Sequence, residues 1–577
     1  MMLALRTIRH LRWRQLAEQV RMRLMRRLAD PAALARRPAT PWPGLRWSPR
    51  GAFLPPGSQD APGNDPSTGR LTFVSDTRDV GAPPDWDIDA PKLWQYNLHY
   101  FEYLWDLSFD DARTLAEDWI DRHTPEIGRV GWEPYPTSLR LVNWTAFFFG
   151  RRREDTLADE AFRDRLFASI VRQADWLSRN IERHLMGNHL FENGVALALV
   201  GAAFEGPDAR RFRRIGQGIL EREIPEQTLA DGGHFERSPM YHCRILYGLL
   251  ALANTGDDAL DALCREPAAR MAAALANMTH PDGRIALFND SAFGIYNPPT
   301  ELIDYARTLG VTDRDTANND AGHFALPQTG YFGARDDAGT FFIIDAGPVG
   351  PDYIPGHAHG DIFSFELSWK GRRVVVDSGC FSYLPGEMRD YCRSTRAHNT
   401  VEVGGADQCE FWGTFRVARR GRPRDVRFER RDDGFVLEGR HDGYRRLPGA
   451  PVHRRRAVWR EAGVLMVRDR VTSGRPVRWV SRLHLHPDCR AEREGDDAVR
   501  IETDRVALRV RFAGPGELSI GRSWYCPRFG QRMENTVIEF ASAGRGEESA
   551  FCVAESRQEI ALDVQEGAVV DGLAYTW

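Results

Sequence analysis

The fold class is decided by the stretch Phe363-Ser364-Phe365-Glu366-Leu367-Ser368-Trp369-Lys370-Gly371-Arg372-Arg373-Val374-Val375-Val376-Asp377. Its first part alternates between apolar and polar side chains, which is the period of a strand with one buried face. Lys370-Gly371 then gives a turn signal before a second run rich in valine. The stretch therefore predicts an antiparallel β-hairpin.

Similar patterns recur towards the C-terminus, over 457–468 with a turn at Gly463, and over 479–486, 499–512 and 536–540. Many short strands separated by turns are typical of an antiparallel β-sandwich. We therefore predict a sandwich domain over 322–577.

Upstream of about residue 322 the apolar period is helical. Apolar residues recur every three to four positions over 160–185, and further helices are predicted over 240–254 and 258–278, with a kink or boundary at Pro267. Helices followed by strands favour separate domains over a βαβ sheet. The prediction is a multidomain α and β protein with a helical domain over 85–321 and a ligand cleft between the domains.

Residues 1–84 are predicted to form a basic amphipathic helix and an irregular segment. Leu5, Ile8, Leu16 and Val20 interleave with arginines, which suits either an anionic membrane surface or docking on the protein itself, and docking is favoured. The segment has no signal-peptide core, and no apolar run long enough to span a membrane occurs. The default expectation is a cytoplasmic location, with a periplasmic or membrane-associated one left open.

The charge balance argues against a nucleic-acid partner. The 577 residues carry a net charge of -4, so no global field attracts the chain to a polyanion. None of the eight cysteines forms a close CxxC pair, which excludes a zinc ribbon and a thioredoxin motif. The composition leaves the oligomeric state open.

Polar residues gather in four clusters, the first of which is Gly187-Asn188-His189-Leu190-Phe191-Glu192. It precedes a helix predicted over 195–204. Asn188, His189 and Glu192 can hydrogen-bond a carboxylate or a sugar hydroxyl. The alternative is helix capping by Asn188 or Asn193.

The second cluster places His234 and Arg237 shortly before Tyr241-His242 at the start of a predicted helix. A tyrosine serves as a base only if cationic or hydrogen-bonding neighbours lower its pKa. His234, Arg237 and His242 are the candidates for that effect. The alternative is that Tyr241 is an aromatic core residue.

The third cluster contains His357 and His359 between glycines, just before a strand. In an extended chain these side chains point to opposite faces, so one can bind a metal while the other faces a substrate. His359, Asp377 and His398, with water, make a plausible tetrahedral zinc site. The alternative is a pair of surface histidines in a loop.

The fourth cluster is a Pro-rich loop that leads into a helix carrying Arg140, Asn143 and Trp144. These side chains can line a sugar-binding groove. Packing of Trp144 in the core is the alternative.

In this order the four clusters resemble the heparinase II/III family of polysaccharide lyases, with its alginate-lyase and chondroitin-lyase relatives, over about 90–420. The resemblance implies an incomplete α/α toroid followed by an antiparallel β-sandwich, with the active site between them. It implies catalytic roles for Tyr241, His357, Asn188 and His189, substrate contact by Glu192, Arg140, Asn143, His234 and Arg237, and a divalent metal, usually zinc, held by His359, Asp377 and His398.

In this family's chemistry, elimination removes the C5 proton of a uronic acid and expels the C4 oxygen. Asn188 and His189 would stabilise the charge that gathers on the carboxylate. Ionised Tyr241 would take the proton for one C5 stereochemistry and return one to the leaving oxygen, and His357 would be the base for the other. The metal would be structural, fixing the loop that presents His357.

The expected function is a polysaccharide lyase acting on a uronic-acid-containing acidic polysaccharide. The N-terminal segment resembles that of heparinase-like proteins linked to bacterial capsule or exopolysaccharide production, so heparin is not carried over as the substrate. One alternative is a glycoside hydrolase, with Glu192, Glu236 and Asp290 as candidate carboxylates. The other is a non-catalytic polysaccharide-binding or assembly protein.

Overall fold

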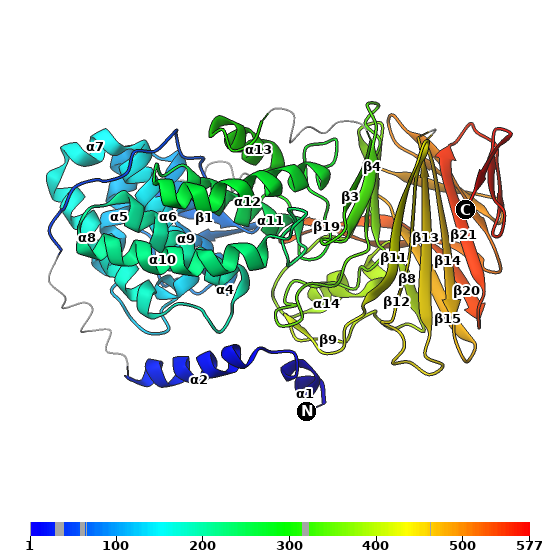
Figure 1. Ribbon diagram of the computed structural model, residues 1–577, viewed down its shortest axis with the longest axis horizontal. Helices are drawn as coiled ribbons and strands as arrows, with labels where there is room; N and C mark the ends of the chain where they lie inside the picture. The colour runs from blue at the N-terminus through cyan, green and yellow to red at the C-terminus, as the bar shows by residue number, and fades with distance from the viewer. Residues whose placement is uncertain (1, 29–39, 58–63, 65, 314–321, 462) are drawn as a thin grey trace.

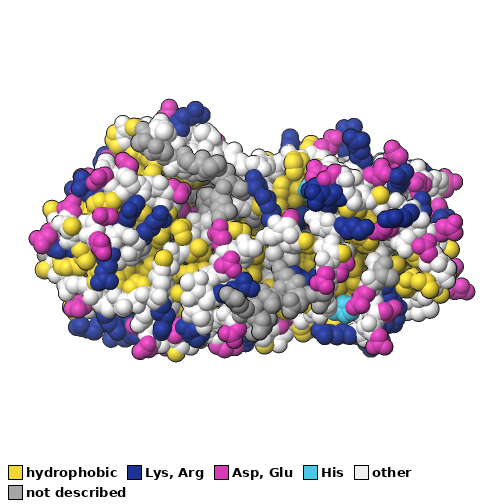
Figure 2. All heavy atoms as spheres, turned by 90° about the horizontal axis from the view of Figure 1, so that it is seen from above, with side chains coloured by type: hydrophobic (Ala, Val, Ile, Leu, Met, Phe, Trp, Pro, Cys, Tyr) yellow, Lys and Arg dark blue, Asp and Glu magenta, His cyan; other side chains and the backbone are white. Residues whose placement is uncertain are grey.

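The computed structural model describes residues 2–28, 40–57, 64, 66–313, 322–461 and 463–577, and it divides into a helical half and a sheet-rich half (Figure 1). The helices of the first half extend from Lys92 to Thr308, and the strands of the second begin at Gly322. The chain is thus an incomplete α/α toroid followed by an antiparallel β-sandwich. Figure 2 shows basic and acidic side chains interspersed over both halves of one face.

The toroid is built from helices that pack as neighbours along the chain. They are α4 (Lys92–Tyr100), α5 (Phe109–Arg122), α6 (Pro134–Ala146), α7 (Arg153–Ala158), α8 (Glu160–Arg179), α9 (Gly187–Ala203), α10 (Gly206–Gln227), α11 (Pro239–Ala253), α12 (Asp258–Asn277) and α13 (Pro299–Thr308). Helix α9 packs against α6, α8, α10 and α11, and all its residues except His189 are buried. A helix covered on every side has no polar face, which accounts for its Ala-, Val- and Leu-rich sequence.

Three local features differ from the sequence prediction. Helix α9 begins at Gly187, so the first polar cluster forms its opening turns instead of a loop before residue 195. Helix α12 continues through Pro267, so the predicted boundary is not there, and Pro267 lies on the partly exposed side, where the carbonyl left unpaired by proline can reach water. Strands β1 (Arg70–Phe73) and β2 (Asp76–Asp79) form a hairpin within the segment predicted to be irregular, and Leu71 and Phe73 pack into the helical core.

The sandwich contains three larger antiparallel sheets. One has the order β3-β4-β5-β6-β7, the second β11-β12-β13-β14-β21-β18-β17-β16, and the third β19-β20-β15-β8. The strands are β3 (Gly322–Leu326), β4 (Tyr331–Arg335), β5 (Phe341–Asp345), β6 (Phe365–Trp369), β7 (Arg372–Val375), β8 (Val401–Val403), β11 (Pro423–Arg431), β12 (Gly434–His441), β13 (Val452–Arg460), β14 (Val464–Thr472), β15 (Val477–His484), β16 (Arg490–Glu494), β17 (Ala498–Glu502), β18 (Ala507–Ala513), β19 (Glu517–Arg528), β20 (Gln531–Gly544) and β21 (Glu548–Glu555).

Smaller elements complete this half. They are β9 (Phe411–Trp412), β10 (Arg416–Val417), α14 (Glu387–Arg393), β22 (Ile560–Asp563), β23 (Gly567–Val570) and β24 (Leu573–Thr576).

The predicted hairpin is present as β6 and β7, and both of its faces are covered. On one face Phe342 and Phe365 join the core that also holds Trp459 from the eight-stranded sheet, and the rings of Phe342 and Trp459 stack at 5.8 Å. On the other face Glu366 accepts hydrogen bonds from the backbone of Leu287 (2.7 Å) and from Arg373 (2.9 Å). The polar side of the hairpin therefore faces the toroid and holds the two domains together.

Helices α1 (Met2–Ile8) and α2 (Trp13–Leu28) lie outside the two halves along one side (Figure 1). Arg6 pairs with Glu410 of the sandwich (3.1 Å), and the Gln15 amide donates to the Tyr353 carbonyl (3.2 Å). Arg12 pairs with Glu226 of α10. Within the part of the chain that the structure describes, no helix is long and apolar enough to cross a membrane.

Candidate active site

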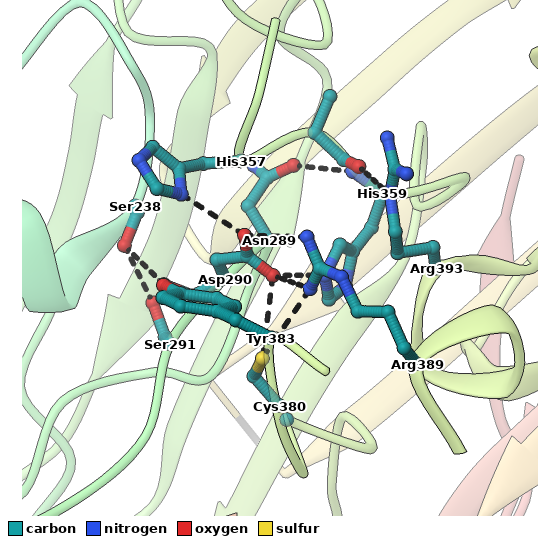
Figure 3. A network of polar contacts seen from close by, with 12 residues as sticks. Ser238, Asn289, Asp290, Ser291, His357, His359, Cys380, Tyr383, Arg389 and Arg393 are labelled. Atoms are coloured by element: carbon teal, nitrogen blue, oxygen red, sulfur yellow. Dashed lines mark hydrogen bonds and ion pairs between the residues drawn. The ribbon is translucent and has the colours of Figure 1, made fainter. Parts of the chain in front are cut away.

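Catalytic candidates from both domains meet at their junction. Helices α9 and α11 bring Asn188 and Tyr241 from the toroid, and the loop before β6 brings His357 from the sandwich. Figure 3 shows the polar network beneath them, in which Asp290 lies between His357, His359 and Arg389. The site therefore needs both domains to be complete.

Tyr241 and His357 form the centre of the site. Their ring centroids lie 4.0 Å apart, and the Tyr241 hydroxyl is 3.1 Å from the hydroxyl of Tyr383. Ser238 caps α11 by accepting a hydrogen bond from the Tyr241 backbone N–H (3.2 Å), and its own hydroxyl donates to the Asp290 carbonyl (2.6 Å). The start of α11 is thereby fixed against the loop that carries Asp290.

His357 lies between two buried carboxylates. Its Nδ1 is 2.9 Å from Asp290 Oδ2, and its Nε2 is 3.3 Å from Glu236 Oε2. Burial by itself raises the pKa of Asp290, but Arg389, His357 and His359 hold that pKa well below its ordinary value. An ionised carboxylate can only accept hydrogen bonds, so Nδ1 of His357 donates to Asp290, and proton transfer would have to use Nε2, which lies beside Glu236.

Glu236 connects His357 to the first cluster. It accepts hydrogen bonds from the Asn188 backbone N–H (3.1 Å) and side-chain amide (3.3 Å). The ring of His189 lies 4.4 Å from that of Tyr135, and its Nδ1 is 3.2 Å from Glu182 Oε1. Burial lowers the pKa of His189, but Glu182 outweighs this effect and the pKa lies above its ordinary value. His189 can therefore present a positive charge beside Asn188.

The structure corrects the predicted environment of Tyr241. Burial raises the pKa of its hydroxyl well above the ordinary value, and Tyr383 raises it further. His234 Nε2 lies 3.3 Å from Gln227 Oε1, and His242 Nε2 lies 2.8 Å from the Met271 carbonyl. The prediction that these histidines lower the pKa of Tyr241 is wrong, because their rings bond to groups elsewhere in the toroid.

Arg237 also has a structural role. Its guanidinium donates to the carbonyls of Thr329 (2.9 Å) and Gln328 (3.0 Å), which belong to the turn between β3 and β4. The expectations that Arg237 lowers the pKa of Tyr241 and that Arg237 and buried His234 contact substrate are therefore corrected. Arg237 joins the toroid to the sandwich, and His234 belongs to the toroid interior.

Three further candidates lie inside the toroid, away from any substrate. Arg244 binds both carboxylate oxygens of Glu192, at 2.8 and 2.6 Å. Arg140 donates to Gln173 (2.8 Å) and to backbone carbonyls, and the Asn143 amide donates to the Tyr100 carbonyl (2.9 Å). Because all three are buried with their polar groups engaged, the expected substrate contacts of Glu192, Arg140 and Asn143 are corrected to internal roles.

The donor types near His359 suit zinc, although the side chains do not form a finished site. Within the described residues, no group of three or more His, Cys, Asp or Glu side chains is placed to hold a metal ion. His398 Nδ1 is 2.8 Å from Asp377 Oδ2, while His359 Nε2 is 2.8 Å from Asp290 Oδ1. The remaining nitrogens, His359 Nδ1 and His398 Nε2, are buried without a hydrogen-bond partner. Imidazole nitrogen and carboxylate oxygen are ligands that zinc accepts.

Sequence reasoning missed Tyr383 and Arg389 and the supporting roles of Glu236 and Asp290. Glu236 and Asp290 attract attention as acidic residues beside apolar segments, but only as candidates for hydrolysis. Arg389 lies 99 positions from Asp290, to which it donates at 2.9 Å. Neither period nor spacing could have linked these two residues, because contact at such separation is created by the fold.

Comparison with known proteins identifies the family to which this arrangement belongs. The model of the heparinase II/III N-terminus matches residues 112–298, and the model of the heparinase II/III-like C-terminal region matches residues 318–563. The chain belongs to the heparinase II/III family. The two matched regions of this family member take in most of the toroid and most of the sandwich, which together form the junction described above.

Two heparin-sulfate lyases are similar to this heparinase II/III-family chain. The one from Pedobacter heparinus is 29% identical over 355 residues, covering 55% of this chain and 51% of the relative. The one from Bacteroides stercoris is 28% identical over 326 residues, covering 49% and 46%. The chain thus spans about half the length of these curated relatives.

Solved structures support the fold of this family member. A crystal structure of heparinase III matches with a TM-score of 0.70 at 17% identity, covering 87% of this chain and 86% of that one. A heparan sulfate lyase from Pedobacter heparinus matches with a TM-score of 0.63 at 18% identity, covering 98% and 94%.

Proposed function

We propose that this protein is a polysaccharide lyase that cleaves a uronic-acid-containing acidic polysaccharide by β-elimination. The observation that carries the proposal is the Tyr241–His357 pair, with ring centroids 4.0 Å apart, beside Asn188 at the domain junction. Elimination needs a base for the C5 proton, an acid for the leaving oxygen and donors for the substrate carboxylate. This group of residues contains a candidate for each role.

The base in this proposal is His357. Because its Nδ1 donates to Asp290 at 2.9 Å, Nε2 takes the C5 proton. The electron pair of the C5–H bond forms the C4–C5 double bond, and the C4–O bond breaks with its electrons on the glycosidic oxygen. Asp290 stabilises the imidazolium that results, because Arg389 and the neighbouring histidines keep this buried carboxylate ionised.

The acid is Tyr241, which departs from the expectation of an ionised tyrosine base. Since burial and Tyr383 raise the pKa of its hydroxyl, Tyr241 holds a proton that it can give to the leaving oxygen. After the product leaves, exchange with water removes the proton from the His357 imidazolium and returns one to the Tyr241 phenolate, which restores both groups. Asn188 and His189 would donate to the uronate carboxylate and stabilise the charge that develops there.

The relatives guide the choice of substrate. The similar heparin-sulfate lyases favour a glycosaminoglycan, and a bacterial exopolysaccharide that contains uronic acid remains the second candidate. The hydrolase alternative is weaker, because its two carboxylates at this site, Glu236 and Asp290, are buried and already hydrogen-bonded. A water-activating pair needs carboxylates open to the sugar.

The test is the ultraviolet absorbance of the unsaturated uronate product, followed while the purified protein is incubated with heparan sulfate, chondroitin sulfate, alginate and bacterial exopolysaccharides. We expect an absorbance rise with one of them, and a fall of at least about 100-fold in rate for Tyr241→Phe, because this change removes the proton donor. Tyr575→Phe, on the distant strand β24, is the matched control. New reducing ends without the absorbance rise would favour the hydrolase, and binding without cleavage would favour the binding protein.

We propose separately that zinc binds at His359, Asp377 and His398 and has a structural role. The two unpartnered nitrogens, His359 Nδ1 and His398 Nε2, support this proposal. A bound cation would fix the loop that presents His357. Purified protein should contain about one zinc per chain, and a chelator should lower its melting temperature, whereas His398→Ala should contain none. Protein that is metal-free as purified and does not bind added zinc would contradict this proposal.

A further inference from the structure

We propose that the outer face of helices α1 and α2 binds an anionic lipid surface. Of the large apolar side chains that are exposed in the described chain, half lie between residues 2 and 20. They are Met2, Leu3, Leu5, Ile8, Trp13, Leu16 and Val20, with exposures from 37% to 72%. Apolar side chains gathered on one short segment mark an interaction surface, whereas single exposed ones are ordinary.

The contacts that hold these helices on the protein come from other side chains. Arg6 and Thr7 contact the β9–β10 region, with Thr7 Oγ1 accepting from Trp412 Nε1 at 3.0 Å. The Arg12 guanidinium lies 3.7 Å from the centre of the Tyr353 ring, and Gln15 is buried. Docking is thus largely polar, and it leaves the apolar side chains on the outside without a partner in the described chain.

The spacing of the exposed residues places them on one face of α2. Trp13, Leu16 and Val20 follow the helical spacing of three and four residues, while the docked side chains Gln15 and Met22 lie about two fifths of a turn away. Over residues 13–23, whose side chains the structure describes, the helix therefore has one face for the protein and a separate apolar face for another surface.

The charge of the segment identifies that other surface. Arg9, Arg14 and Arg23 are exposed and form no ion pair with any carboxylate in the described ranges. A helix with unpaired arginines beside leucine, valine and tryptophan suits the boundary between anionic headgroups and acyl chains. An acidic polysaccharide would use the arginines but would leave Leu5, Ile8 and Val20 in water, so the aliphatic side chains favour lipid.

Both helices lie along the same side of the molecule, beneath the toroid and the sandwich (Figure 1). A flat surface that takes up their apolar face would hold both domains without entering the junction that contains Tyr241 and His357. The proposal does not depend on the reaction that the junction catalyses, because it involves no residue of that site.

The test is co-sedimentation of the full-length protein with vesicles of phosphatidylcholine and phosphatidylglycerol, compared with vesicles of phosphatidylcholine alone. We expect binding to the anionic vesicles that weakens as salt is added. The triple variant Trp13→Ser, Leu16→Ser and Val20→Ser should bind at least about tenfold more weakly, because its face can no longer enter the acyl boundary. Its melting temperature should stay unchanged, since none of the three side chains is buried.

The matched control changes exposed apolar residues at the other end of the chain, Val569→Ser with Leu573→Ser on β23 and β24. This variant should bind vesicles like the unchanged protein. Absent binding, equal binding to both kinds of vesicle, or full binding by the triple variant would overturn the proposal. If the triple variant bound vesicles normally but was no longer retained on an acidic polysaccharide, the polysaccharide would replace lipid as the partner. If it bound vesicles normally but lost a self-association seen by sedimentation velocity, a second copy of the chain would replace lipid.

Discussion

At the scale of single residues, the site depends on a carboxylate that we expect not to react. Glu236 accepts hydrogen bonds from both the backbone N–H and the side-chain amide of Asn188, and it lies 3.3 Å from Nε2 of His357. It therefore positions an amide needed for the substrate carboxylate and, at the same time, the proposed base. Glu236 is therefore a positioning residue, and its removal should lower activity by displacing Asn188 and His357.

We predict that Glu236→Gln lowers kcat about tenfold and changes KM little, because the amide keeps an acceptor for Asn188 but loses the charge beside His357. Glu236→Ala should lower kcat further and destabilise the fold by about 1–3 kcal/mol, since it leaves the Asn188 backbone N–H buried without an acceptor. Steady-state rates and urea unfolding measure the two effects. A glutamine variant as inactive as the alanine variant would contradict the positioning role.

The residue types in the sequence identified the candidate catalytic residues better than they identified the environment of each side chain. Asn188, Tyr241 and His357 stand in polar clusters that the sequence shows, and the fold brings them together. Arg140 looked equally polar, yet it is buried because α6 is covered over almost its whole length. Sequence alone could not distinguish these cases, since which face of a helix is covered depends on the packing of the other helices.

At the scale of elements, the start of α9 determines where Asn188 lies. Gly187 has a φ of 55°, and a Cβ added there would lie 2.7 Å from Glu236 Oε1. Only glycine adopts this conformation easily and also leaves room for the carboxylate. The first helical turn and the position of Glu236 are therefore determined together.

We predict that Gly187→Ala destabilises the protein by about 1–3 kcal/mol and lowers lyase activity, because it adds backbone strain and displaces Glu236. Gly218→Ala on α10 is the matched control, since its Cβ would meet nothing within 4 Å. That change should leave activity intact and stabilise the helix by about 0.5–1 kcal/mol. Urea unfolding and initial rates of both variants test the prediction, which fails if the two behave alike.

The period of apolar residues predicted which segments are helices or strands, but it did not predict which of their faces other elements cover. The alternation over 363–369 predicts a strand, and β6 is that strand. It does not reveal that the Ser and Glu side would be covered by the toroid, because a polar side chain with partners 79 or more residues away in the toroid looks like a solvent-facing one. Ser368 and His280, 88 positions apart and 2.7 Å from each other, illustrate this.

At the scale of the whole molecule, the order of helices before strands was visible in the sequence, and the contact between the domains was not. Arg373 of β7 donates to Asp282 after α12 at 2.7 Å and to Glu366 of β6 at 2.9 Å. Its side chain is 4% exposed. This buried arginine joins the toroid to the sandwich, so it also maintains the junction in which the proposed site lies.

The ion pair between Arg373 and Asp282 should make the free energy of unfolding depend on pH. Burial raises the pKa of Asp282, but Arg373 outweighs this effect and brings the pKa to about 2. The unfolded value is about 3.9. Because the folded pKa is the lower one, the stabilisation is fully present above about pH 4 and is lost as the pH falls towards 2. Its size is about 1–2 kcal/mol after allowing for the 32% exposure of the Asp282 side chain.

We therefore predict that the free energy of unfolding of Asp282→Asn is lower than that of the unchanged protein at pH 7, and that the difference shrinks between pH 4 and pH 2. Urea unfolding across this range measures it, with Asp496→Asn as the control because Asp496 is fully exposed. The control should follow the unchanged protein at every pH. A constant difference between Asp282→Asn and the unchanged protein would mean that Asp282 is not the titrating group, and that the junction is held independently of its charge.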